Sequence, residues 1–424
     1  MSERVTPVGW EATSTDQLIR EGALVIGDGY RAKNSEFVRD GGLPFIRVGD
    51  ITNRIQTDAR DELPVDQLTV YGQKVSQTDD CLITMKGTVG RVARVQETTQ
   101  RFVYSPQISF WRVMDRSRVN PRFLRHWLQS PDFAEQSFAT KSATDMADYI
   151  NLRDQRRMRI LLPPYAIQRR IAAFLSAFDE LIEINERRIA LLEDLARSLY
   201  QEWFVHFSFP GHEEMEFVDS ELGPIPKGWA VRPLFEVSTV GFGFPFGSAH
   251  FAESGPFPVI RIRDVPRGVT TTFTDEEPQN HHLVRDGDVL VGMDGEFHLR
   301  EWSGGDAWLN QRVARLRPSA GLSARHLMLA VMGPIRAWNE SISGTTVAHL
   351  GKRHLEAIRV VLPEERILNE AGAHFDHVAG SHLALIKKNR ALATTRDLLL
   401  PRLVTGRLDI SDVDLGDLLP ADAA

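Results

Sequence analysis

Two stretches of the chain place apolar residues at steps of three and four, the spacing of one face of an α-helix. The first runs from about residue 165 to about residue 204, and at about 1.5 Å per residue it would span on the order of 60 Å. The second follows residue 363 and repeats its apolar positions less regularly. A helix longer than a small domain needs a partner face, so the pattern predicts that the two helices pair as an antiparallel coiled coil. A plainer alternative is that each helix only covers the sheet of its own domain.

Short apolar runs and Gly-rich turns precede each helical stretch, and the order of their motifs is duplicated. Residues 45–51 (FIRVGDI) recur as residues 259–265 (VIRIRDV), and residues 80–87 (DCLITMKG) recur as residues 288–295 (DVLVGMDG). This self-similarity predicts an α+β fold with a pseudo-twofold internal repeat, in which two mixed α/β domains alternate with the two long helices.

The same pattern predicts the domain boundaries. The expected parts are a first globular domain (1–160), a first helical spacer (161–208), a second globular domain (209–360), a second helical spacer (361–408) and a disordered acidic tail (409–424).

Charge and cysteine content constrain the function classes. A net charge of −7 argues weakly against a nucleic-acid ligand, but much of the acidity lies between the two halves and in the tail. Cys81 is the single cysteine, which excludes a disulfide framework and a multi-cysteine zinc site and fits a reducing cytoplasm. The chain lacks a signal-peptide pattern and a run of about 18 apolar residues, so we expect a cytoplasmic protein without a membrane segment.

Motifs for catalysis are incomplete. Residues 162–165 (LPPY) are similar to the Asn/Asp-Pro-Pro-Tyr motif of amino-methyltransferases, but Leu162 cannot accept a hydrogen bond from a target amine. Residues 344–352 have the wrong spacing for a phosphate-binding loop. His374 and His377 lie one helical turn apart, yet no cysteine or carboxylate cluster accompanies them as metal ligands. The sequence therefore predicts neither a catalytic centre nor a metal site.

Four motifs in the right order resemble those of type I restriction-modification specificity subunits. They are residues 223–229 (GPIPKGW), 162–168 (LPPYAIQ), 202–205 (EWFV) and 396–406 (RDLLLPRLVTG). The second helix departs from the first because it opens with residues 362–365 (LPEE) and contains Gly372 and Gly380, which are poor helix formers.

This resemblance implies two target-recognition domains and a non-catalytic role in phage defence. It implies as partners double-stranded DNA, two copies of a methylation subunit that binds S-adenosylmethionine, and a restriction subunit that uses ATP and Mg. The chain itself would carry no cofactor. The residues expected to bind partner subunits are the apolar positions Phe178, Ile182, Ile189, Leu192, Leu195, Leu199, Trp203, Leu392 and Leu399.

The candidate DNA-reading residues lie on loops whose side chains match base edges or phosphates. Arg and Lys suit guanine, Asn and Gln suit adenine, and acidic groups suit the cytosine amine. In the first half they are Arg31, Lys33, Asn34, Lys86, Thr88, Arg91, Tyr104 and Gln107; in the second half they are Ser248, His250, Asp294, Glu296, His298, Arg300, Asn310, Gln311 and Arg312. Because these residues differ between the halves while the apolar framework repeats, we expect an asymmetric bipartite target. Two alternatives stay open: a stand-alone DNA methyltransferase with fused recognition domains, and a coiled-coil scaffold without DNA function.

Overall fold

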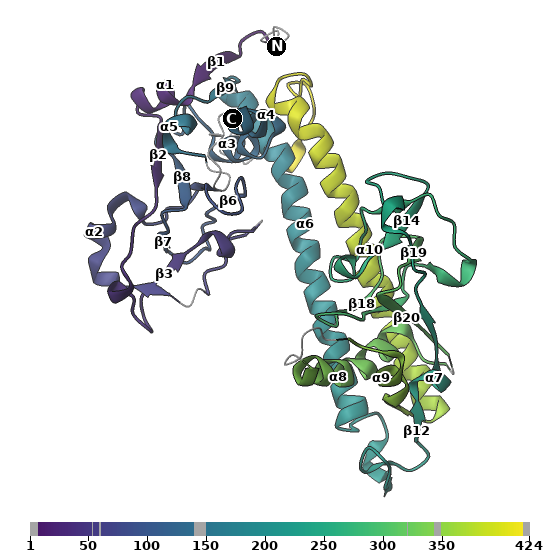
Figure 1. Ribbon diagram of the computed structural model, residues 1–424. Coiled ribbons are helices and arrows are strands. Elements are labelled where there is room, and N and C mark those ends of the chain that lie inside the picture. The colour runs from purple at the N-terminus through teal and green to yellow at the C-terminus, as the bar shows by residue number, and fades with distance from the viewer. Residues whose placement is uncertain are drawn as a thin grey trace. The chain divides into compact units, whose positions relative to one another are not determined.

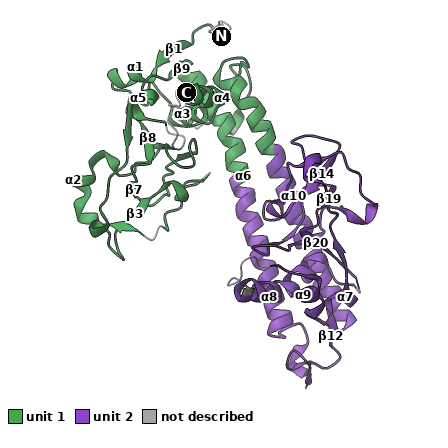
Figure 2. Ribbon diagram, viewed as in Figure 1, with its two compact units in different colours: residues 1–182, 392–424 green, residues 183–391 purple. Residues whose placement is uncertain are grey.

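The computed structural model describes residues 7–52, 54–58, 61–139, 150–319, 321–342 and 349–418. It divides into two compact units: unit 1, residues 1–182 with 392–424, and unit 2, residues 183–391. Figure 2 shows that each unit contains a globular part and a portion of both long helices.

Unit 1 is built on two small sheets (Figure 1). The larger sheet has the antiparallel order β2 (Leu24–Asp28), β8 (Ile108–Val113), β5 (Cys81–Thr84), β6 (Val92–Arg94). The smaller one has the order β4 (Glu62–Leu63), β3 (Leu43–Ile46), β7 (Val103–Tyr104). A separate pair joins β1 (Glu11–Ser14) to β9 (Arg159–Leu162). The helices of this globular part are α1 (Thr15–Arg20), α2 (Leu68–Tyr71), α3 (Pro121–Leu128), α4 (Pro131–Ala139) and α5 (Leu152–Gln155).

The core of unit 1 forms where α3 covers the larger sheet. Asn120 starts α3 because its side chain accepts hydrogen bonds from two backbone amides of the first turn, and Pro121 occupies the position where no amide is needed. The helix then buries Trp127 against Trp111 of β8, with ring centroids 6.0 Å apart. Leu175 and Leu403 of the long helices join the same core.

Unit 2 repeats this order of elements. Its larger sheet is β13 (Ser238–Phe242), β20 (Val313–Pro318), β17 (Val289–Gly292), β18 (Leu299–Glu301), and its smaller sheet is β15 (Phe273–Thr274), β14 (Phe257–Ile260), β19 (Ala307–Leu309), β16 (Leu283–Val284). The pair β12 (Ala230–Pro233) and β21 (Arg359–Leu362) corresponds to β1 and β9, and a hairpin joins β10 (Phe217–Val218) to β11 (Ile225–Pro226). The helices are α7 (Leu234–Val237), α8 (Ala324–Ile342) and α9 (Lys352–Ala357). The predicted α+β fold and its internal repeat are confirmed.

An ion pair, buried in unit 1 and partly exposed in unit 2, explains why an aspartate opens the repeated strand β5 or β17. Asp80 accepts two hydrogen bonds of 2.7 Å from the guanidinium of Arg112, and Asp288 accepts bonds of 2.6 and 2.8 Å from Arg317. The pair ties the start of β5 to the end of β8 in unit 1, and β17 to β20 in unit 2. Bidentate geometry of this kind fixes both direction and distance between the strands.

The long helices are α6 (Tyr165–Tyr200), which continues as a π-helical turn (Gln201–Val205), and α10 (Glu365–Val404). In unit 1 Asp179 of α6 accepts a hydrogen bond of 2.6 Å from Arg396 of α10. In unit 2 Asn185 pairs with Asn389 and Glu193 with His382, at 2.7 and 3.0 Å. Partner numbers on α10 fall as those on α6 rise, so the predicted antiparallel pairing is confirmed. Each helix also packs against the globular part of a unit, but the alternative in which a helix only covers its own domain is wrong because the two helices pair.

The first part of the expected acidic tail is packed. Ile410 and Leu415 are buried in the core of unit 1, and Arg170 of α6 donates a hydrogen bond of 3.1 Å to the Ile410 carbonyl. Residues 419–424 lie outside the described residues. Among the helices of the described ranges, none is long and apolar enough to cross a membrane.

Candidate nucleic-acid interface

One edge of the larger sheet gathers the loops that the sequence singled out in unit 1. Because β8 is antiparallel to β2 and β5, the ends of β2 and β5 meet the beginning of β8 there. The Met85 amide donates to the Gln107 carbonyl at 2.8 Å, and the Tyr30 amide donates to the Tyr104 carbonyl at 2.7 Å. We call residues 29–36, 85–91 and 105–107 the unit 1 tip. The three predicted loops therefore form one continuous surface.

Most predicted side chains of the unit 1 tip reach solvent. Arg31, Lys33, Asn34, Lys86, Thr88 and Gln107 are exposed. Arg91 is half-buried, and its guanidinium donates a hydrogen bond of 2.8 Å to the Ile51 carbonyl, so it holds a neighbouring loop in place.

Tyr104 corrects the prediction. Its side chain is fully buried, and its hydroxyl donates to the carboxylate of Asp80. Burial raises the pKa of Tyr104 well above its ordinary value, with the neighbouring Asp80 charge acting in the same direction. With no exposed surface and its hydroxyl already paired, this residue is not available to read DNA.

The Lys86 loop has a defined conformation. Gly87 and Gly90 both adopt positive φ angles, 84° and 89°, which favour glycine. The Thr84 hydroxyl donates to the Thr88 carbonyl at 2.5 Å and accepts from the Arg91 amide at 3.0 Å. These bonds close the turn, so Lys86 and Thr88 project from an ordered backbone.

Unit 2 presents the equivalent edge, which we call the unit 2 tip: residues 243–250, 293–298 and 310–312. The Met293 amide donates to the Arg312 carbonyl at 3.0 Å, and the Phe244 amide donates to the Leu309 carbonyl at 2.8 Å. Ser248, His250, Glu296, Gln311 and Arg312 are exposed, whereas Asp294 and His298 are half-buried.

Two of the residues predicted to read DNA in unit 2, Asn310 and Arg300, instead form hydrogen bonds with backbone groups. Asn310 is only 8% exposed, and its side-chain oxygen accepts from the Arg312 amide at 3.4 Å. The half-buried Arg300 donates a hydrogen bond of 2.6 Å to the Pro266 carbonyl. Both side chains shape neighbouring loops.

The two tips differ in charge. In the unit 2 tip Asp294 accepts from Arg312 at 2.7 Å and from His349 at 2.6 Å, and His250 lies 2.8 Å from Asp275. The charge of Arg312 is thus offset by Asp294. The unit 1 tip instead exposes the cations Arg31, Lys33 and Lys86. The same backbone edge carries two chemically distinct surfaces.

The residues expected to bind partner subunits fall into two groups. Phe178, Leu192, Leu199, Trp203 and Leu399 pack against apolar clusters of the chain itself, and Ile182, Ile189 and Leu392 are half-buried. Leu195 is 56% exposed and, with Leu191 at 67%, borders a groove of about 540 Å³ between α6 and α10 of unit 2.

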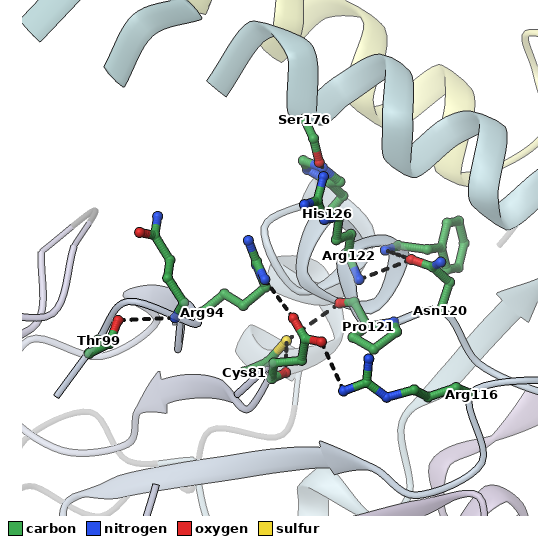
Figure 3. Close-up of polar contacts among 12 residues, drawn as sticks. Cys81, Arg94, Thr99, Arg116, Asn120, Pro121, Arg122, His126 and Ser176 are labelled. Carbon is green, nitrogen blue, oxygen red and sulfur yellow. Dashed lines mark hydrogen bonds and ion pairs between the residues drawn. The ribbon is translucent and has the colours of Figure 1, made fainter. Parts of the chain in front are cut away.

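An Arg-His pair recurs in α3 and α8, outside the motifs named from the sequence; in both units the histidine contacts the long helices, whereas Arg325 of α8 pairs with Glu301 of β18. In unit 1 Arg125 of α3 forms an ion pair of 2.6 Å with Asp179, and His126 lies 3.3 Å from the Ser176 hydroxyl of α6 (Figure 3). In unit 2 the equivalent His326 of α8 packs on the rings of Phe204 and Phe375. Burial lowers the pKa of each histidine to about 3. The recurrence of Arg-His at a spacing of 200 residues was the available signal.

Cys81 is a buried free thiol. Its thiol contacts the Pro121 carbonyl at 3.7 Å, and burial raises the pKa of Cys81 to about 12 (Figure 3). Within the described ranges, no group of three or more His, Cys, Asp or Glu side chains could hold a metal ion.

Residues 21–194 match the type I restriction modification DNA specificity domain. The chain is 32% identical over 214 residues to the type I restriction enzyme EcoBI specificity subunit of Escherichia coli, covering 49% of this chain and 45% of that protein. It is 25% identical over 270 residues to the type I restriction enzyme MjaIX specificity subunit of Methanocaldococcus jannaschii, covering 61% and 62%. The chain therefore spans between about half and two thirds of the length of these curated relatives.

The fold has a known counterpart. The S subunit of a type I restriction-modification system from M. genitalium superposes with a TM-score of 0.55 at 16% identity, over 94% of this chain and 96% of that one. The resemblance and the fold class predicted from the sequence motifs are thereby confirmed.

Proposed function

We propose that this chain, which carries a type I restriction modification DNA specificity domain at residues 21–194, is the DNA-recognition subunit of a type I restriction-modification complex. It reads a bipartite, asymmetric duplex target, with one half-site for each tip. The observation that carries the proposal is the repetition of one backbone edge in both units with unlike side chains at its surface.

The side chains of the tips suit base recognition in the major groove. Lys86 and Arg31 match the guanine acceptors, and Asn34 and Gln107 match the paired donor and acceptor of adenine. In unit 2, Glu296 can accept from a cytosine amine and Gln311 can pair with adenine. Because the two sets differ, the two half-sites should differ in sequence.

The reaction chemistry belongs to other subunits in this proposal. Two methylation subunits dock on the long helices and bind S-adenosylmethionine, and a restriction subunit that uses ATP and Mg joins them in the cytoplasm. The exposed Leu191 and Leu195 beside the groove of unit 2 support a docking surface there, since exposed apolar side chains that border a groove are typical of interaction sites. The chain itself is non-catalytic.

Selection from a random duplex pool tests the proposal. The full chain, purified with its methylation subunit, should enrich one bipartite motif whose two specified parts differ and flank an unspecified spacer. Enrichment of no motif would favour the scaffold alternative, and a continuous or palindromic motif would contradict one half-site per tip. Titration of the chain alone with S-adenosylmethionine should give no saturable binding. Saturable binding would favour the alternative of a stand-alone methyltransferase, which must bind this cofactor itself.

A further inference from the structure

An arginine recurs at the end of a strand that borders each tip: Arg47 after β3 and Arg261 after β14. The residue before each arginine accepts a hydrogen bond from the turn of the tip, Ile46 from the Ser105 amide at 2.9 Å and Ile260 from the Asn310 amide at 3.2 Å. The two arginines therefore occupy equivalent places directly beside the reading edges.

The backbone at each arginine is fixed in the same way. The Arg47 amide donates to the Asp50 carboxylate at 2.7 Å, and the Arg261 amide donates to the Asp264 carboxylate at 2.9 Å. The repeated motif with Arg and Asp three residues apart thus forms a capped turn. Because the arginine is the first residue of this turn, the turn fixes the backbone from which its side chain projects.

Each guanidinium also lies over a phenyl ring at an equivalent position. Arg47 is 5.7 Å from the ring centre of Phe37, and Arg261 is 5.1 Å from that of Phe251. Both rings follow the single 3-10 turn of a tip loop (Asn34–Glu36 and Ser248–His250). Stacking uses the face of a guanidinium, so it leaves the N–H donors at the edge available for an acceptor.

The acidic partner is not repeated. Asp61 forms an ion pair of 2.6 Å with Arg47. Its counterpart is Thr272, because the Asp61 and Thr272 carbonyls accept from the equivalent amides of Phe45 and Val259. Among the described residues, no carboxylate lies within ion-pair distance of the Arg261 side chain. The stacked arginine and its capped turn are therefore present in both units, whereas the acidic partner is present only in unit 1. If the arginine served only an internal ion pair, we would expect the acid to recur with it.

Base-reading groups must change with the sequence that they read, whereas backbone phosphates are the same in every half-site. We propose that Arg47 and Arg261 each bind a DNA backbone phosphate, one in each half-site, and thereby position the adjoining tip. This inference rests on the proposed DNA-recognition function. The side-chain exposure of 53% for Arg47 leaves room for such a contact beside Asp61.

Salt-dependent binding of the full chain with its methylation subunit tests the inference, using a labelled target duplex and a scrambled duplex of equal length. Arg47→Gln and Arg261→Gln should each weaken binding to both duplexes by the same factor, roughly three- to tenfold at about 0.15 M salt. Each should reduce the slope of log affinity against log salt by about 1. The ratio between the two duplexes should not change.

Matched controls come from the opposite end of each sheet. Arg20 precedes β2 and pairs with Asp16, and Arg232 precedes β13 and lies 3.9 Å from Glu236; both are exposed. Arg20→Gln and Arg232→Gln should leave affinity and slope unchanged. Arg47→Lys should keep the slope, because it keeps the charge.

Asp61→Asn separates the proposal from a structural role for Arg47. Removing the Asp61 carboxylate frees the N–H donors of Arg47 for a phosphate, so affinity for both duplexes should rise. If the Arg47–Asp61 ion pair only stabilised the fold, affinity would not rise. Unchanged slopes in the Gln variants, or a loss confined to the target duplex, would overturn the phosphate assignment. Equal binding of the wild-type complex to both duplexes would instead refute the proposed function, while the slopes would still report the phosphate contacts.

Discussion

The buried carboxylate of Asp80 determines where Tyr104 points. In a sequence, Tyr104 beside Ser105 and Pro106 is typical of a turn residue that reaches solvent. In the fold, Asp80 accepts from Arg112 and also from the Tyr104 hydroxyl, because a buried charge requires several donors. Asp80 lies 24 residues before Tyr104 in the sequence, so the residues next to Tyr104 do not indicate that its hydroxyl will be needed as a donor.

Arg47 and Arg261 belong to a motif that repeats in the sequence, residues 45–51 and 259–265. Repetition alone does not separate a packing residue from a binding residue. The separation required the 53% exposure of the Arg47 side chain and the stacking of both guanidinium groups on equivalent phenyl rings, and Arg261 is half-buried. The loops at residues 31–34 and 86–88, in contrast, were located from their polar, Gly-rich composition, and their exposure agrees with that reading.

His326 gives a prediction at this scale. Neither of its ring nitrogens has a hydrogen-bond partner among the described residues, and its pKa is lowered to about 3 by burial. Below about pH 6.5 an unfolded histidine binds a proton that the folded one excludes, so stability falls as the pH drops toward 3, by up to about 1.4 kcal/mol per pH unit.

His326→Phe should therefore raise the free energy of unfolding by about 1–3 kcal/mol, since it removes unpaired buried polar atoms, and should flatten the loss of stability between pH 7 and pH 5. Denaturant titrations at both pH values measure the two effects. The surface variant His206→Phe serves as the control. If His326→Phe were less stable than the wild-type chain at pH 5, the imidazole would have to make a favourable polar interaction in the folded state.

At the scale of elements, the periodicity of apolar residues located the long helices but did not predict which side of each helix the rest of the chain covers. The apolar positions of α6 are numerous enough to surround much of the helix. Leu192 and Leu199 pack inside unit 2, whereas Leu191, absent from the predicted seam, is 67% exposed. Which face is covered depends on where α10 and the globular part dock, and a single helix does not encode that.

The docking surface can be tested without disturbing the fold. Leu191→Asp combined with Leu195→Asp should abolish assembly with the methylation subunit, because the added charges would be buried without partners in the complex. Both side chains are more than half exposed, so the variant chain should keep its melting temperature within a few degrees. Ala190→Asp with Ser198→Asp, at exposed positions of the same helix, is the matched control. Co-purification measures assembly, and an intact complex with the leucine variant would place the methylation subunit elsewhere.

At the scale of the whole molecule, the duplication was the most informative feature of the sequence. It predicted the repeat, the alternation of globular and helical parts and the antiparallel pairing, because recurring motifs must fold alike to bury the same apolar framework. The packing of Ile410 and Leu415 was not predicted, since a short acidic segment has no periodic pattern. The domain boundaries and the bases read by each tip stay predictions.

Single-molecule methylome sequencing of cells that carry this chain with its methylation subunit tests whether each tip reads one half-site. We expect one methylated motif with two unlike half-sites separated by a spacer. Lys86→Ala with Thr88→Ala should change the bases of one half-site only, and Gln311→Ala with Arg312→Ala should change only the other, because each pair lies on a different tip. A motif without two parts, or simultaneous change of both half-sites by either pair, would contradict the assignment of one half-site to each tip.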